Sequence, residues 1–271
     1  MVRVEMLAVG KELLIGRTMN SNAHWIGKRL ARMGTMLKEI TTVDDDLDEI
    51  ASAYRAALKR KPDFLIVVGG LGPTPDDMTL RGIANGMGVT LRKSEQALAL
   101  IMEHYARRGL QQIELTPARL KMAKLPAGAE AVFNKAGTAP GVRLVEWKTT
   151  VYCLPGVPVE MRGIFRGTVE PEIKMRLGNL HRKYITIKLE GILESALAPV
   201  IAQEMKRHPG AYIKSHPRGI REGVSRIELD IAVVGEDGRR VDDEGEEIAS
   251  NMQREIEDSG GSVKSASGLE G

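Results

Sequence analysis

The sequence is poor in cysteine and aromatic residues, and it has little net charge. Cys153 is the only cysteine among 271 residues, which excludes an internal disulfide and a cysteine-cluster metal site and is typical of a reducing compartment. Aromatic residues make up 4% of the chain and the net charge is +3, which leaves few stacking platforms and no strongly basic surface. We therefore do not expect a nucleic-acid partner.

Long apolar runs are also missing. No stretch approaches the roughly 20 apolar residues that span a bilayer, and the N-terminus runs into a strand-like segment at 2–9 without the basic and apolar regions of a signal peptide. We expect a cytoplasmic protein with no membrane partner. A chain of 271 residues also favours two domains over one.

Strand-like and helix-like segments alternate along the first part of the chain. Apolar and β-branched runs predict strands at 4–9, 36–43, 64–68, 142–145 and 150–154. Helical spacing predicts helices at 22–33 and 47–58, and two more within 94–123, separated by a break at 108–109. This order predicts an α/β fold with a mostly parallel sheet flanked by helices, whose ligands bind beyond the carboxyl ends of the strands.

A change of composition near 177–183 predicts a second domain. The first domain would span 1–176, and a smaller α+β domain would span 177–262, with strands at 184–189, 211–214 and 227–234 and helices at 194–205 and 241–256. Residues 263–271 are rich in Gly and Ser, so we expect them to form a flexible tail.

The segment from Val67 to Thr79 is the most informative one. It reads as a buried strand, a loop with Gly69, Gly70 and Gly72, and the start of a helix. Backbone N–H groups of such a loop bind phosphate, and Asp76 and Asp77 would repel a phosphate unless a divalent cation lay between them. The alternative is a tight turn in which one of the two acids only caps the following helix.

Two other places carry candidate ligand contacts. Leu154 to Met161 forms a second strand-to-helix loop, whose Glu160 either points into the crevice or only complements the positive end of its helix. Asn20 and Asn22 either hydrogen-bond a ribose or phosphate, or cap the helix that carries Trp25. Cys153 is expected to be a small buried residue.

Taken together, these segments resemble the amino-terminal domain of the CinA family of competence- and damage-inducible proteins. The resemblance covers roughly residues 1–170, and 191–199 with 215–217 resemble the smaller domain that follows in CinA proteins. The segments that carry it are Gly10 to Arg17, Asn20 to Asn22, Thr41 to Asp45, Gly69 to Thr79, Gly137 to Gly141 and Leu154 to Pro158.

The resemblance implies a three-layer α/β/α fold like the molybdopterin-binding domains of MogA, MoaB and MoeA. It implies a divalent-metal-dependent pyrophosphatase, using Mg²⁺, Mn²⁺ or Co²⁺, that acts on ADP-ribose or FAD. Catalysis is assigned to Asp77 and Asp76, and metal binding to Asp77 and Glu12. Phosphate or nucleotide binding is assigned to Gly69, Gly70, Gly72, Pro73, Thr74, Thr79, Asn20, Asn22, Gly137, Thr138, Pro155, Gly156 and Glu160.

Two other functions use the same glycine loop. A molybdopterin or nucleotide binder would give no product, and an adenylyltransferase related to MogA would transfer AMP from ATP to a pterin phosphate. Because the sequence ends before the amidase domain of longer CinA proteins, we expect no deamidase activity. A homodimer is also expected, since C2 dimers are the commonest soluble oligomers.

Two positions depart from the CinA pattern. Lys11 stands where an Asp or Asn is more usual, which predicts a cation beside the proposed metal carboxylate. Leu193 stands where a Gly is frequent, so no ligand role is assigned to the Glu194 and Ser195 that follow.

Overall fold

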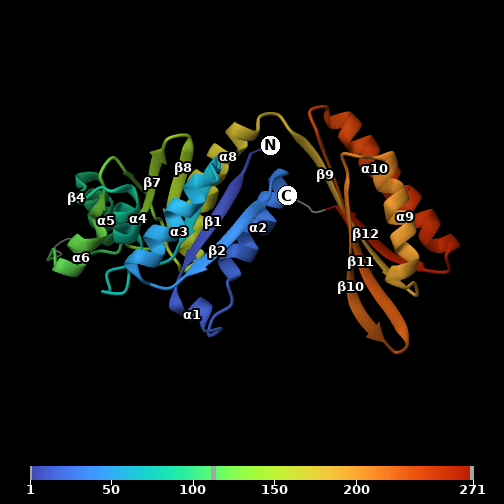
Figure 1. The fold of residues 1–271 in the computed structure, drawn as a ribbon, viewed down its shortest axis with the longest axis horizontal. Coiled ribbons are helices and arrows are strands. Elements are labelled where there is room, and N and C mark those ends of the chain that lie inside the picture. Colours follow the sequence, from blue (N-terminus) through green and yellow to red (C-terminus); the bar gives the residue numbers. More distant parts are fainter. Residues whose placement is uncertain (1, 111–113, 269–271) are drawn as a thin grey trace. The chain divides into compact units, whose positions relative to one another are not determined.

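Buried apolar strands form the centre of the larger of two compact units. The computed structural model describes residues 2–110 and 114–268. It divides the chain into one unit of residues 1–31 and 35–177, and a second unit of residues 178–271 with 32–34. Figure 1 shows the elements of both. Within the described ranges, no helix combines the length and apolar character needed to cross a bilayer.

The larger unit alternates strands and helices, as the sequence predicts. Its strands are β1 (Val4–Val9), β2 (Leu37–Val43), β3 (Phe64–Val68), β4 (Leu91–Lys93), β5 (Lys124–Pro126), β6 (Glu130–Val132), β7 (Gly141–Glu146) and β8 (Thr149–Leu154). Its helices are α1 (Lys11–Leu14), α2 (Ser21–Met33), α3 (Leu47–Lys59), α4 (Thr79–Met87), α5 (Glu95–Arg107), α6 (Pro117–Met122), α7 (Pro158–Ile164), the π-helical segment Phe165–Val169 and α8 (Glu170–Leu177).

Six of these strands form one mixed sheet in the order β2-β1-β3-β8-β7-β6. The pairs β1–β2, β1–β3 and β3–β8 are parallel, whereas β7 runs antiparallel to both β8 and β6. The central strands β1 and β3 are buried along their whole length, because helices cover both faces of the sheet. The predicted α/β class with a mostly parallel sheet is confirmed.

Alternate residues of the central strands face different helices. Leu7 and Val67 belong to one core with Tyr54 of α3, Ile83 of α4 and Ile101 of α5. On the other side, α2 is tied to the last helices of the unit. Arg29 donates to both carboxylate oxygens of Glu170 at 2.6 and 3.0 Å, and Trp25 packs edge-on against Phe165.

Three helices of this unit begin at residues whose side chains cap them. Asp46, Ser94 and Thr116 accept hydrogen bonds from the first backbone N–H groups of α3, α5 and α6. Helix α4 differs, because its N-cap is Met78 and no side chain caps it. The expectation that Asp76 or Asp77 caps this helix is therefore wrong.

The second unit is a four-stranded antiparallel sheet with two helices. Its order is β9 (His181–Glu190), α9 (Glu194–Arg207), β10 (Tyr212–Arg221), β11 (Val224–Gly235), α10 (Gly238–Asp258) and β12 (Ser262–Gly268). The sheet order is β10-β11-β9-β12, and residues such as Ile187, Leu229 and Ile248 form a core separate from that of the larger unit. This β-α-β-β-α-β arrangement agrees with the expected small α+β domain.

The predicted flexible tail is an edge strand over most of its length. Strand β12 pairs antiparallel with β9, and Val263 packs against the core of the unit. The Gly and Ser content obscured this strand, because an edge strand needs only one paired side and a single apolar anchor. Residues 269–271 of the predicted tail lie outside the described residues.

Candidate functional site

Loops that follow four parallel strands meet at one edge of the large sheet. Strands β1, β2, β3 and β8 share one direction, and they are followed by Gly10, Asp44, Gly69 and Pro155, respectively. In open α/β sheets, ligands bind beyond this end of the strands. The predicted Gly-rich loop therefore lies at the functional edge.

The first two glycines of this loop have no room for a side chain. Gly69 has a φ of 114° and Gly70 a φ of 60°. A Cβ atom on Gly69 would overlap the carbonyl oxygen of Val9, and one on Gly70 would overlap the hydroxyl of Thr79. Thr79 is fully buried and donates to the Gly69 carbonyl at 2.8 Å. Thr79 therefore holds the loop from beneath, and the ligand contact predicted for it is wrong.

Hydrogen bonds within the loop orient the Asp77 carboxylate and leave three backbone N–H groups of the loop without an acceptor among the described residues. The N–H and hydroxyl of Thr74 donate to Asp77 Oδ2 at 2.8 and 2.6 Å. Within the described part of the chain, the N–H groups of Gly70, Leu71 and Gly72 donate to no other residue. Because unbonded N–H groups favour anions, the loop can accept phosphate oxygens.

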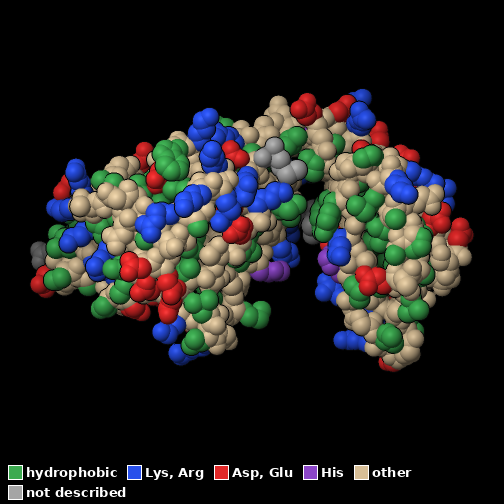
Figure 2. Space-filling view, in the orientation of Figure 1, with side chains coloured by type: hydrophobic (Ala, Val, Ile, Leu, Met, Phe, Trp, Pro, Cys, Tyr) green, Lys and Arg blue, Asp and Glu red, His purple; other side chains and the backbone are tan. Residues whose placement is uncertain are grey.

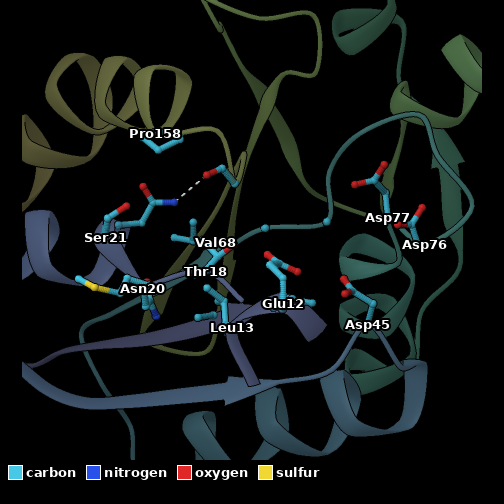
Figure 3. A pocket seen from close by; sticks show the side chains of 18 residues that line it. Glu12, Leu13, Thr18, Asn20, Ser21, Asp45, Val68, Asp76, Asp77 and Pro158 are labelled. Carbon is cyan, nitrogen blue, oxygen red and sulfur yellow. Dashed lines mark hydrogen bonds between the residues drawn. The ribbon is translucent and has the colours of Figure 1, made fainter. Parts of the chain in front are cut away.

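A cavity of about 240 Å³ opens beside this loop and is lined by four carboxylates, from Glu12, Asp45, Asp76 and Asp77. We call it the acidic cavity. Neither Lys nor Arg is among its lining residues. In the close-up of Figure 3, these four side chains lie on one side, while Asn20 and Ser21 lie across from them. The structure thus brings together the metal and catalytic residues assigned from the sequence.

The lysine expected beside the metal carboxylate points elsewhere. Lys11 Nζ lies 3.3 Å from Asp44 Oδ2, and its backbone N–H donates to Asp45 Oδ2 at 2.9 Å. The expected effect of Lys11 on Glu12 is therefore not seen, because Asp44 attracts the ammonium group. The ammonium group of Lys11 therefore does not offset the negative charge of Glu12.

Two carboxyl groups of the acidic cavity, those of Asp45 and Asp76, have shifted pKa values. Burial raises the pKa of this carboxyl group above its ordinary value, and the charges of Glu12, Asp44 and Asp76 raise it further against the lowering effect of the Lys11 N–H. Asp76 differs, because hydrogen bonding by the Thr74 hydroxyl lowers its pKa. Figure 2 shows acidic side chains gathered around the start of α3, close to Asp45 in the chain.

The two asparagines have different positions. Asn20 Oδ1 accepts from the Ala23 N–H at 3.0 Å, which confirms the capping interpretation for this residue, although it also lines the acidic cavity. Asn22 Nδ2 donates to the Gly156 carbonyl at 2.7 Å, while Asn22 Oδ1 is buried without a partner in the described residues. An unpaired acceptor that lines a cavity is suited to a ligand hydroxyl or N–H group.

Glu160 lies in a neighbouring cavity of about 460 Å³. Asn134 Nδ2 donates to Glu160 Oε2 at 2.7 Å, and a Cβ atom on Gly137 would overlap the Glu160 carboxylate. Gly137 thus makes room for Glu160 without lining a described cavity itself. Glu160 shares this cavity with Gly70, Gly72, Pro73, Asp77, Thr138, Pro155 and Gly156.

Sequence reasoning missed several lining residues. It named Asp45 only within a segment of the CinA resemblance and assigned it no contact, and it gave no role to Arg81, Lys121 or Tyr105, which line cavities next to the Gly-rich loop. A signal was available for Asp45, which follows a parallel strand. Thr74, in contrast, was predicted to bind ligand but serves here to orient Asp77.

No complete metal centre is preformed by protein side chains. Among residues 2–110 and 114–268, no three His, Cys, Asp or Glu side chains are arranged to hold a metal ion together. Mg²⁺ commonly uses one or two carboxylates together with substrate phosphates and water. The acidic cavity fits an ion bound in that way.

Comparison with known proteins gives the family. The profile of the family described as "Probable molybdopterin binding domain" matches residues 5–175, which contain the whole site. The chain belongs to this family. A protein of Metallosphaera sedula is 39% identical over 259 residues, covering 96% of each chain. A protein of Pyrobaculum arsenaticum is 40% identical over 226 residues, covering 83% of this chain and 84% of the relative.

A solved structure is similar to this molybdopterin-binding domain. It is the protein CinA of Thermoplasma acidophilum, described as having unknown function. It is 42% identical, with a TM-score of 0.57, and the match covers 62% of this chain and 98% of the CinA chain. The similarity to a CinA protein agrees with the sequence resemblance.

Proposed function

We propose that this chain is a metal-dependent pyrophosphatase that cleaves a nucleoside diphosphate-linked compound, such as ADP-ribose or FAD, at the diphosphate. The observation that supports this proposal is the acidic cavity, where four carboxylates without a cationic side chain adjoin the glycine loop. A diphosphate alone would be repelled there. A diphosphate with a divalent cation would satisfy both the carboxylates and the N–H groups.

Each side chain has a distinct role in this proposal. The N–H groups of Gly70 and Gly72 bind phosphate oxygens. Asp77, held by Thr74, and Glu12 hold a Mg²⁺, Mn²⁺ or Co²⁺ ion. When bound, such an ion neutralises charge that develops on the diphosphate and lowers the pKa of a water molecule. Asp45 and Asp76 add negative charge that favours the cation, and Asn22 Oδ1 accepts from a ligand hydroxyl.

The carboxylates of this cavity fit a hard divalent cation. Their ligand atoms are oxygens, and burial together with the repulsion from Glu12, Asp44 and Asp76 raises the pKa of Asp45, so a positive charge there would be favoured. A non-catalytic nucleotide or molybdopterin binder and an adenylyltransferase would use the same glycine loop. The reaction product therefore separates the three functions.

The test is release of AMP from ADP-ribose and FAD with Mg²⁺, Mn²⁺ or Co²⁺, by wild type and by Asp77→Asn. We expect the variant to lower kcat/KM at least about 100-fold, the size of effect seen when a preorganised electrostatic group is removed. The matched control is Asp48→Asn, an exposed carboxylate on α3 outside the cavity. Ligand binding without product in the wild type would contradict the pyrophosphatase, and full activity of Asp77→Asn would remove Asp77 from the mechanism.

A further inference from the structure

A second cavity, larger and of opposite charge, adjoins the same glycine loop. It measures about 610 Å³ and is lined by the loop, α4, residues 89–91 and the segment from α6 to β5. Its lining includes Arg81, Lys121 and Lys124, and among the described residues that line it Asp77 alone is acidic. We call it the basic cavity. Gly70 and Asp77 line both this cavity and the acidic one.

The cations of the basic cavity are largely uncompensated. Neither Arg81 nor Lys124 lies in an ion pair with any described residue, and the Lys121 ammonium donates to the carbonyl oxygen of Thr74. Burial lowers the pKa of Lys121, and the charges of Asp77 and Asp76 act against that lowering. Three cationic side chains from α4, α6 and β5 therefore outnumber the two nearby carboxylates, Asp77 and Asp76, a balance that favours an anionic group such as phosphate.

The walls of the basic cavity are apolar. Ala84 and Met122 are 2% and 5% exposed, and Leu71 and Leu80 complete the surface between the loop and α4. Asn85 and Thr90 add an amide and a hydroxyl on the exposed side. Ligand sites of drug-sized molecules occupy about 300 to 1,000 Å³ and combine apolar walls with a few polar groups. This cavity has that size and lining.

The acidic cavity is too small and too negative for the same ligand group. Its 240 Å³ lies below that range, and its four carboxylates accept hydrogen bonds from hydroxyls or bind a cation. A ligand that spans both cavities would cross the loop at Gly70 and Asp77, the residues that the cavities share.

We infer that the basic cavity binds the nucleoside monophosphate half of the substrate. Its phosphate lies against Lys121 and Arg81, and its planar base lies between the apolar walls with its polar edge toward Asn85 and Thr90. This inference rests on the proposed function, because it places the scissile diphosphate at Asp77. In ADP-ribose the other half is a ribose phosphate, which is smaller than AMP and then enters the acidic cavity, where carboxylates accept from its hydroxyls.

The test is calorimetric binding of AMP, adenosine and inorganic pyrophosphate to the full chain without metal. Lys121→Met keeps the length of the side chain and removes its charge, so AMP and pyrophosphate should bind at least tenfold more weakly and adenosine within twofold of wild type. Thr90→Phe fills the cavity from an exposed position. The affinity for AMP and adenosine should therefore fall at least tenfold, while the affinity for pyrophosphate stays within twofold of wild type. The control, Lys38→Met, removes an exposed lysine outside the cavities and should change nothing.

Unchanged AMP affinity in Lys121→Met, or unchanged adenosine affinity in Thr90→Phe, would overturn the inference. Asn85→Ala, an exposed position on α4, replaces Thr90→Phe if that variant does not fold, with the same ligands and the same direction of change. The outcome is separable from that of the proposed function. Binding changes as expected without turnover by wild type would reject only the pyrophosphatase, and turnover with unchanged AMP binding in the variants would reject only the subsite.

Discussion

The charge of Asp45 opposes folding. Its pKa is raised in the folded protein, so folding is favoured while the carboxyl is protonated, and this contribution is lost as the pH rises from the ordinary value of 3.8 through the raised one. Because the group is partly exposed, the cost at neutral pH is modest. The charge of Asp45 therefore does not stabilise the fold at neutral pH.

We predict that Asp45→Asn makes the metal-free protein more stable at pH 7, by about 0.5 kcal/mol. The amide removes the repulsion from Glu12, Asp44 and Asp76 but still accepts from the Lys11 N–H. Urea unfolding of wild type and variant at pH 7 and pH 3.5 measures the effect, and the difference should disappear at the lower pH. A destabilised variant at pH 7 would mean that the hydrogen bond outweighs the repulsion.

Many of the site residues that the sequence predicts follow a strand or lie in a glycine-rich loop, whereas Glu12, Asn22 and Glu160 lie in the helices α1, α2 and α7. Asp76 and Asp77 are found in this way because a buried strand ends in glycines just before them. Lys121 and Arg81 are not, since nothing in their own segments distinguishes them from surface cations. Only the folding of α4 and α6 beside the loop brings them to the ligand edge.

At the scale of elements, side-chain caps decide where several helices begin. Asp46 accepts from the N–H groups of Asp48 and Glu49 at 2.9 and 3.0 Å, which fixes the start of α3. We predict that Asp46→Ala destabilises the larger unit by about 1 kcal/mol. Denaturant unfolding measures this, with Asp48→Ala as the control, because Asp48 lies in the same turn but caps nothing. An equal loss of unfolding free energy in both variants would mean that negative charge near the positive end of the helix dipole, and not the cap, stabilises α3.

Elements with continuous apolar burial are predictable, and short or one-sided ones are not. Strands β1, β3 and β8 follow from their apolar runs because both faces of the sheet are covered. Strand β10 was expected to end at Lys214 but continues to Arg221, since residues 217–221 extend the pairing with β11 while they are exposed to solvent. The three-residue strands β4, β5 and β6 carry too few residues to show any period.

At the scale of the whole molecule, each unit has its own hydrophobic core. Leu65 and Ile187 are fully buried, one in each core. We predict that calorimetry resolves two unfolding transitions. Leu65→Ala should lower the temperature of one and Ile187→Ala that of the other, because each substitution reduces the unfolding free energy of its own unit by about 2 to 5 kcal/mol. A single transition shifted equally by both substitutions would show that the units unfold together.

The homodimer expected from the sequence stays a prediction. Light scattering of the full chain should give a mass of about twice the 29.6 kDa of the chain. The measurement should be repeated over a range of protein concentrations, because a weak dimer dissociates on dilution. A monomer at the highest concentration would exclude it.

Gly69 and Gly70 also determine how this protein can be engineered. Each is held against a neighbour that a Cβ atom would overlap, the Val9 carbonyl in one case and the Thr79 hydroxyl in the other. In a library that varies the loop, most variants with a substitution at either of these two positions would therefore misfold. Asn85 and Thr90 are exposed and lie outside the loop, so randomising them should diversify ligand choice while the scaffold survives.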